Sequence, residues 1–267
     1  MISRHGALSG IQNRGACRVA GKNLTNVPCL ADDEIHIWTV KIDGQGNGTA
    51  RSAEMLAPAE RVRASGFRSE IDAARFIQRR TALREILGGY LGVAAQDVAF
   101  AVNEFGKPSV LAPKPRPDLS FNAAHSGALA LVAVGRSVQI GIDVERLRSE
   151  VEGVDIAARF FAVNEVASLA ALRPRDRGEG FFNAWTRKEA IVKALGRGLS
   201  IPLDAFEVSL RPREPPVILR WNIPGDDAKR WRIHHLEPAS GYVGALAVDS
   251  VTRVCRFWSW AADRPRK

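Results

Sequence analysis

The sequence predicts an α+β protein built from two similar halves, and three observations support this fold class. Short apolar runs typical of strands alternate with longer segments of helical spacing, in the order strand, helix, strands, helices, strands. Several predicted strands follow one another through short turns, as antiparallel pairing allows. The 267-residue chain also divides near residue 140 into halves of similar composition, which suggests a duplicated architecture without an exact repeat.

The first half is predicted to begin with a strand at about residue 34, where Ile35, Ile37 and Val40 lie close together. Residues 59–87 carry apolar side chains at roughly helical spacing and predict one or two helices, which the glycine pair at 88–89 would end. The other elements expected in this half are strands at 98–102, 119–122 and 128–134, a loop at 44–48, and an extended proline-rich linker at 113–117.

The second half is predicted to start with a strand at 138–144 and to continue as helices. Residues 156–172 predict one helix, residues 173–180 a charged loop, and residues 181–195 a helix that Gly196 ends. A closing antiparallel meander is expected at 206–210, 217–221, 230–236 and 242–248.

The composition excludes several classes of protein. Hydrophobic residues make up 46% and charged residues 25%, which is an ordinary globular balance and excludes a wholly disordered chain, a collagen or a coiled coil. The longest clean apolar run, at 128–134, is far shorter than the ~20 residues that span a bilayer, so no membrane partner is expected. Cys17, Cys29 and Cys255 match neither a disulfide framework nor a zinc pattern, which favours a cytoplasmic location.

The net charge of +9 lies mostly at the two ends of the chain. Residues 1–33 and 251–267 are predicted to be basic tails, the first of them flexible, on either side of subdomains at 34–140 and 141–250. Residues 1–30 hold four basic residues and no acidic one, and the last 17 residues also carry +4. The net charge is therefore a poor guide to the partner, and its local placement matters more.

The first group of candidate functional residues is the segment Gly-Ile-Asp-Val-Glu at 141–145. On a strand, Asp143 and Glu145 leave the same face, because side chains alternate with a period of two. Two carboxylates on one face suit a cation such as Mg²⁺, which prefers oxygen ligands. The spacing alone also fits an exposed strand end whose acids are solvated or paired with a nearby arginine.

A second group lies in the segment Trp-Thr-Arg-Lys-Glu-Ala-Ile-Val-Lys at 185–193. Glu189 and Lys193 are four residues apart, so they share one face of a helix. A carboxylate and an ammonium fixed together can act as base and acid, and the lysine can offset phosphate charge. Pairs of this kind are also common as surface ion pairs.

Two weaker groups lie earlier in the chain. His125 and Ser126 are predicted to lie in a turn between two apolar strands, where ligand-binding groups often collect. The segment 61–84 contains seven arginines and only two acids, and Arg63, Arg75 and Arg79 could contact phosphates. Solvated loop and helix residues would explain both patterns equally well.

Taken in order, these segments resemble the signature motifs of the 4′-phosphopantetheinyl transferases, in particular the monomeric, two-halved type that activates surfactin synthetase. The motifs that carry the resemblance are Gly-Lys-Pro at 106–108, Phe-Asn-Ala-Ala-His-Ser at 121–126, and the segments 141–145 and 185–193. The resemblance implies two subdomains related by a pseudo-twofold axis, each an antiparallel sheet packed with helices, with the active site between them. It also implies a monomer that moves the phosphopantetheine arm of coenzyme A to a serine of an apo carrier protein.

The resemblance assigns roles residue by residue. Asp143, Glu145 and Glu189 would hold Mg²⁺, or Mn²⁺, against the pyrophosphate. Glu189 would act as general base toward the carrier serine, and Lys193 and Asp143 complete the implied catalytic group. The implied contacts to coenzyme A are Lys107, Pro108, His125, Lys188, Lys193, Arg63 and Arg75.

Two positions depart from the family pattern, and two other functions compete with transfer. Ala124 stands where the family often has serine, and Glu60 lies near a position that is often basic, so coenzyme A affinity is expected to be lower or its contacts rearranged. A non-catalytic coenzyme A or nucleotide binder on the same scaffold is the main alternative. A nucleic-acid binder is not expected, because no nucleic-acid recognition motif accompanies the charge.

The sequence offers one candidate segment for the contact with the carrier protein. Residues 156–172, with Phe160 and Phe161, are one candidate for it because they lie between the two main motifs. A core position for these aromatic side chains fits the sequence equally well.

Overall fold

The computed structural model describes residues 27–43, 49–112, 117–148, 153–249 and 253–260. The first half contains β1 (Glu34–Lys41), α1 (Thr49–Glu54), α2 (Pro58–Ser65), α3 (Glu70–Leu91), β2 (Ala99–Val102), β3 (Pro108–Ala112), β4 (Leu119–Ser126) and β5 (Leu129–Arg136). The second half contains β6 (Ile140–Arg146), α4 (Val154–Phe160), α5 (Val163–Ala170), α6 (Pro174–Leu195), β7 (Phe206–Val208), β8 (Ile218–Trp221), β9 (Arg232–Leu236) and β10 (Tyr242–Val248). The last strand is β11 (Val254–Trp260), and short 3₁₀ turns lie at Ala95–Asp97, Gly198–Ser200, Leu203–Ala205 and Ala228–Arg230.

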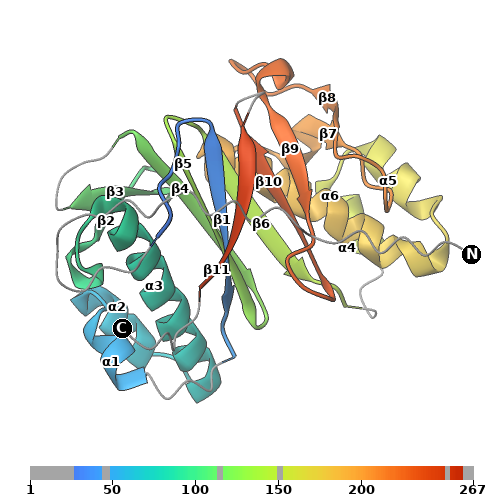
Figure 1. Ribbon diagram of the computed structural model, residues 1–267. Helices are drawn as coiled ribbons and strands as arrows, with labels where there is room; N and C mark the ends of the chain where they lie inside the picture. The colour runs from blue at the N-terminus through green and yellow to red at the C-terminus, as the bar shows by residue number, and fades with distance from the viewer. Residues whose placement is uncertain (1–26, 44–48, 113–116, 149–152, 250–252, 261–267) are drawn as a thin grey trace, which may run out of the picture.

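Two main sheets form the centre of the molecule, with helices outside them (Figure 1). One has the strand order β11-β1-β5-β4 and the other β6-β10-β9, while β2-β3 and β7-β8 are separate two-stranded sheets. One hydrophobic cluster joins α3 to the first sheet, a second joins α6 to the second sheet, and a third contains residues of both sheets. The predicted α+β fold with two helix-covered sheets is confirmed.

Most predicted strands occur where apolar residues alternate, and several boundaries differ from the prediction. The helix over 59–87 is two helices, because Ser69 caps a new helix by accepting from the Asp72 N–H. Its end lies beyond the glycine pair, at Gly92, whose φ of 72° favours glycine. The predicted meander is also divided, since β7 pairs only with β8, whereas β9 pairs with β10 of the main sheet.

The helical region of the second half is the larger correction. Residues 173–180, predicted as a charged loop, form the first turns of α6, which begins at Pro174, where the missing N–H costs nothing. Residues 156–172 form two helices separated at Phe161 and Ala162. The expected end of α6 at Gly196 is confirmed, with a φ of 68°.

Both predicted tails contain ordered core contacts. Leu30 is buried in the cluster between α3 and the first sheet, so part of the predicted N-terminal tail packs on the core. The segment 254–260 is strand β11, which lies parallel to β1 and stacks Trp258 on Trp38 with ring centroids 6.0 Å apart. The predicted loop at 44–48 and most of the linker at 113–117 lie outside the described residues. None of the described helices combines the length and the apolar composition that a membrane span requires.

Candidate functional site

The site forms where strand β6 meets helix α6. The predicted alternation on β6 is confirmed, because Ile142 and Val144 are fully buried between the two sheets and Asp143 faces the other way, toward α6. Gly141 lets the helix approach closely, since a Cβ there would overlap the backbone of α6.

An ion pair between Asp143 and Lys193 lies at the centre of this site. The Lys193 ammonium donates to Oδ1 of Asp143 at 2.6 Å, and Oδ2 of the same carboxylate is buried without a hydrogen-bond partner. Burial raises the pKa of Asp143 to about 7, and the negative charges of Glu189 and Glu145 act in the same direction against Lys193. A second cation beside this carboxylate would relieve that repulsion.

Glu145 is held by a residue of the neighbouring strand. Ser126, at the end of β4, donates to Oε2 of Glu145 at 2.6 Å and accepts from the backbone N–H of Arg146 at 3.1 Å. Farther along, Oδ1 of Asn122 accepts from the Ile142 N–H at 2.9 Å. Two β4 side chains therefore bridge the halves, and the Ser126 hydroxyl is already engaged and does not replace the hydroxyl missing at Ala124.

A basic cavity of about 480 Å³ opens on the face of β4 that carries Ala123 and His125, opposite the face of Asn122 and Ser126. His125 lies on the strand itself and not in the predicted turn, and its Nε2 atom is bonded to the guanidinium of Arg79. Desolvation and the positive charges of Arg79 and Lys193 lower the pKa of His125 to about 4, so the ring is neutral at pH 7. His125 therefore accepts from Arg79 in the free protein.

The three arginines predicted to contact phosphates differ in what they line and contact. Arg79 and Arg63 line the cavity, with their guanidinium carbons 5.1 and 5.5 Å from the Phe76 ring centroid. Arg75 does not line it and pairs with Asp72 at 3.9 Å instead, although its Nε atom is buried without a partner. The sequence could not select Arg79 over Arg75, because two residues four apart lie on neighbouring parts of one helix face.

Glu60 pairs with two further arginines of this segment. Its carboxylate pairs with Arg80 and Arg84 and caps α2 by accepting from the Ala57 N–H at 2.9 Å. Burial opposes its ionisation, but the hydrogen bonds from Arg84, Ala57 and Arg80 hold the pKa of Glu60 below its usual range. The acidic departure at Glu60 therefore holds Arg80 at the wall of the cavity and pairs with Arg84 behind it.

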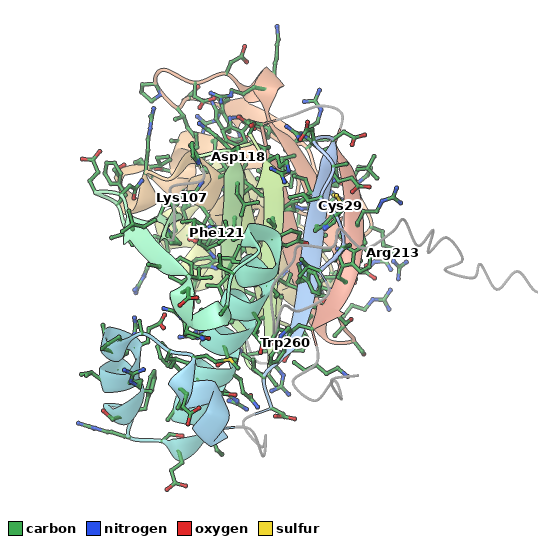
Figure 2. The ribbon with its side chains drawn as sticks, turned by 60° about the vertical axis from the view of Figure 1, so that its left-hand side comes forward. Cys29, Lys107, Asp118, Phe121, Arg213 and Trp260 are labelled. Carbon is green, nitrogen blue, oxygen red and sulfur yellow. The ribbon has the colours of Figure 1, made fainter. Side chains whose placement is uncertain are left out.

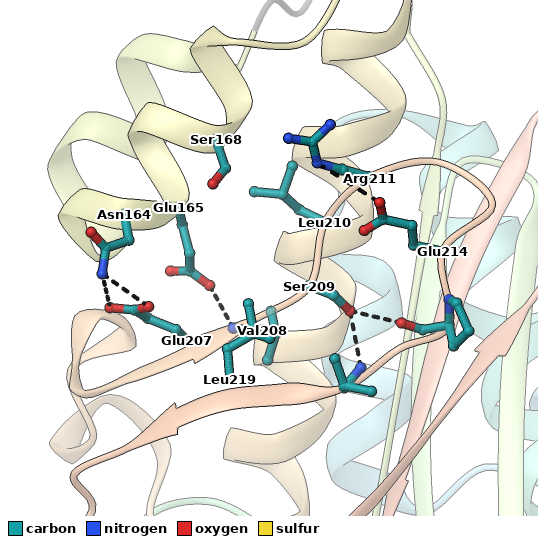
Figure 3. Close-up of a pocket in the computed structure, with 12 residues that line it drawn as sticks. Asn164, Glu165, Ser168, Glu207, Val208, Ser209, Leu210, Arg211, Glu214 and Leu219 are labelled. Carbon is teal, nitrogen blue, oxygen red and sulfur yellow. Dashed lines mark hydrogen bonds and ion pairs between the residues drawn. The ribbon is translucent and has the colours of Figure 1, made fainter.

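The family resemblance implies that Lys188 contacts coenzyme A, but this side chain does not line the basic cavity. Its side chain is fully buried, and the ammonium pairs with Glu165 at 2.7 Å and donates to the carbonyls of Leu203 and Phe206. One helical step turns a side chain by about 100°, so Lys188 faces α5 and β7 while its neighbour Glu189 faces the site. Glu165 lines a separate pocket of about 300 Å³ between α5 and β7–β8, shown in Figure 3.

Lys107, labelled in Figure 2, does not line the cavity either, whereas its neighbour Pro108 does. The Lys107 ammonium donates to the carbonyls of Ala194 at 2.7 Å and Ile140 at 3.2 Å. Burial lowers the pKa of Lys107 to about 8. Its predicted contact with a phosphate is therefore not made by this arrangement.

The metal prediction rests on the chemistry of the carboxylates. Among the described residues, no group of three or more His, Cys, Asp or Glu side chains is arranged so that it could hold a metal ion as it stands. The donor set nevertheless fits Mg²⁺, because Asp143 retains a buried, unpartnered oxygen and the charges of Glu145 and Glu189 act on it.

Comparison with known proteins finds one family. Residues 139–247 match the model of the 4′-phosphopantetheinyl transferase superfamily. The chain is 36% identical over 231 residues to 4′-phosphopantetheinyl transferase HetI of Nostoc sp., covering 86% of this chain and 94% of that protein. It is 32% identical to 4′-phosphopantetheinyl transferase Sfp of Bacillus subtilis, over 60% of this chain and 69% of that protein. It is 26% identical to the mouse L-aminoadipate-semialdehyde dehydrogenase-phosphopantetheinyl transferase, over 72% of this chain and 67% of that protein.

Proposed function

The chain belongs to the 4′-phosphopantetheinyl transferase superfamily, and we propose that it transfers the phosphopantetheine arm of coenzyme A to a serine of an apo carrier protein at the Asp143–Lys193 pair. The observation that carries this placement is the position of that pair. It lies close enough to His125 in the basic cavity for the Lys193 charge to act on the His125 ring. A phosphate-rich ligand could therefore extend from the cavity to the carboxylates, and one chain supplies both parts as a monomer.

The basic cavity would take the phosphates of coenzyme A. Arg79 and Arg63 offer guanidinium groups that bind phosphate oxygens through paired hydrogen bonds. His125 would add a third contact once an anion displaces its bond to Arg79. Arg75 and Lys188 take no part in this proposal, because their side chains do not line the cavity.

The carboxylates would carry the transfer itself. Glu189 takes the proton of the carrier serine, whose oxygen bonds to the β-phosphorus while the bond to the departing adenosine 3′,5′-bisphosphate breaks. Lys193 offsets negative charge on the departing phosphate, and Asp143 orients Lys193 through the 2.6 Å ion pair. Mg²⁺ or Mn²⁺, held by Asp143, Glu145 and Glu189, would supply charge stabilisation to the pyrophosphate.

Intact-mass measurement of apo carrier proteins tests this function. The chain is incubated with coenzyme A, Mg²⁺ and a panel of acyl and peptidyl carrier proteins from its source organism. Transfer predicts that at least one carrier gains the mass of phosphopantetheine while adenosine 3′,5′-bisphosphate accumulates. Binding of coenzyme A with no mass gain on any carrier would favour the non-catalytic alternative.

Substitution of Arg79 tests the binding cavity. Arg79→Gln is expected to raise KM for coenzyme A by about tenfold with a smaller change in kcat, because a charged hydrogen bond to phosphate is lost. Arg75→Gln is the matched control, since Arg75 lies one turn earlier on α3 and outside the cavity. Steady-state kinetics of both variants decide the assignment, and a larger KM effect in Arg75→Gln would reverse it.

Proton uptake tests the role of His125. The pKa of the ring is lowered to about 4 by desolvation and nearby cations, and a bound phosphate would raise this pKa by adding negative charge. Coenzyme A binding should therefore take up protons near pH 6, and its affinity should fall as pH rises through the pKa of the complex. Calorimetry in buffers of different ionisation enthalpy measures this uptake, which should be smaller in His125→Gln.

The face of α4 and α5 is our proposal for the carrier contact. Phe160 is 49% exposed and Val163 84% exposed, and the Phe160 ring lies edge-on to Trp185 with centroids 6.5 Å apart. Trp185 lies one turn before Glu189 on α6, so this face adjoins the site. Phe161 is not part of it, because its ring is buried and stacks on Phe181.

Substitution of Phe160 tests that contact. Phe160→Ser is expected to raise KM for the carrier protein by about tenfold and to leave coenzyme A affinity unchanged, because an aromatic anchor is lost. Phe257→Ser, at an exposed phenylalanine of β11, is the matched control. Equal kinetics for the two variants would place the carrier elsewhere.

A further inference from the structure

The turn between β2 and β3 is organised around the side chain of Asn103. Its Oδ1 atom accepts from the N–H groups of Phe105 at 3.0 Å and Lys107 at 2.8 Å. The Asn103 N–H also donates to the Lys107 carbonyl at 3.0 Å, and Gly106 has a φ of 84° that favours glycine. The turn therefore presents both Asn103 and Lys107 in a defined geometry.

This turn of the first half contacts the last turn of α6 in the second half. The Asn103 amide donates to the Gly196 carbonyl at 2.8 Å, and the Lys107 ammonium donates to the Ala194 carbonyl at 2.7 Å. The same ammonium reaches the carbonyl of Ile140, the first residue of β6, at 3.2 Å. Two side chains thus join the start of β6 to the end of α6.

These contacts stabilise the C-terminal end of helix α6. The last four carbonyls of a helix lack partners within it and carry a partial negative charge, so a cation and an amide donor stabilise them. The fit is close, because a Cβ at Gly196 would lie 2.8 Å from Cδ of Lys107. Ala194 directly follows Lys193, so the contacts act on the turn that carries the Asp143 partner.

We propose that Lys107 and Asn103 are positioning residues that fix the last turn of α6, and with it Lys193, against the first half. The neighbours of Lys107 extend the connection, since Gly106 and Pro108 line the basic cavity. Filling of the cavity and placement of Lys193 are then coupled through one turn. This inference rests on the proposed function for its kinetic consequence, but not for its structural one.

A role for Lys107 as a phosphate ligand makes a different prediction. A phosphate ligand would face the cavity with free donors, and its loss would act mainly on KM. The Lys107 ammonium is instead bonded to two backbone carbonyls, and its side chain does not line the cavity. Loss of a positioning residue should act on kcat and on the local stability of the α6 end.

Hydrogen exchange and kinetics of Lys107→Met test the proposal. Methionine keeps an unbranched apolar side chain and removes the donor, so amide exchange at residues 192–198 of the free protein should rise by about tenfold. The kcat should fall by about tenfold, with less than about a threefold change in KM for coenzyme A. Lys229→Met, at an exposed lysine, is the matched control and should change neither.

A second variant keeps the test decisive if Lys107→Met does not fold. Asn103→Asp retains the acceptor that closes the turn and sets a carboxylate against the Gly196 carbonyl, so it should also raise exchange at residues 192–198. Unchanged exchange in the folded variants, or a raised KM with unchanged kcat and exchange, would overturn the proposal. Absence of transfer by the unaltered protein would refute the proposed function and leave the exchange result standing.

Discussion

Replacing Glu189 by glutamine is expected to lower kcat by about a thousandfold while the protein stays folded. Within the described part of the chain, Glu189 makes no hydrogen bond or ion pair, and its side chain is half-buried beside the Asp143–Lys193 pair. An amide keeps the shape of the side chain but cannot take the serine proton. Single-turnover transfer at saturating coenzyme A measures the loss directly.

Glu179→Gln is the control for this prediction, because Glu179 is an exposed glutamate of the same helix. It should transfer at the rate of the unaltered protein. Circular dichroism of Glu189→Gln should match that protein as well. Activity of Glu189→Gln within a few-fold of the unaltered protein would remove Glu189 from the role of base.

Asp143→Asn is expected to abolish most metal-dependent activity, by about a thousandfold, without loss of stability. Asparagine can still accept from Lys193, but it removes a buried negative charge that Glu145 and Glu189 repel. The carboxylate is thus retained at a cost to stability, as is common for groups that serve function. The predicted signature is a variant with an equal or higher melting temperature and almost no transfer.

The stability effect should depend on pH in one direction. Burial raises the pKa of Asp143 to about 7, so the folded protein binds more protons than the unfolded chain between about pH 4 and pH 7. Stability therefore falls as pH rises through this window, and the stability advantage of Asp143→Asn should grow. Thermal unfolding with a chelator present measures this, and an advantage that shrinks with pH would contradict the assigned environment.

The parts of the fold that sequence could predict are those set by local pattern. Alternating apolar residues located most strands, and Gly196 located the end of α6, since a left-handed residue there favours glycine. The two acids of β6 were placed on one face because side chains on a strand alternate. Local pattern was therefore enough to predict the shared face of Asp143 and Glu145, whereas the roles of these carboxylates and of Lys193 stay predictions.

What sequence could not predict depends on contacts between distant residues. Strand β11 pairs with β1 across more than two hundred residues, and the register that sets Trp258 on Trp38 has no local signal. Lys107 and Lys188 belong to segments that resemble family motifs, yet burial and backbone carbonyls direct both ammonium groups away from the cavity. Which arginine of α3 faces β4 likewise follows from how the helix packs on the sheet.

We propose that Asp143, Glu145 and Glu189 bind a divalent cation beside the phosphates of coenzyme A. The most direct test is the amount of Mn²⁺ bound per chain, measured by electron paramagnetic resonance with coenzyme A present. The prediction is one Mn²⁺ per unaltered chain and none per chain of Asp143→Asn at the same concentrations. Equal Mn²⁺ binding by the two proteins would show that Asp143 is not a ligand of the cation.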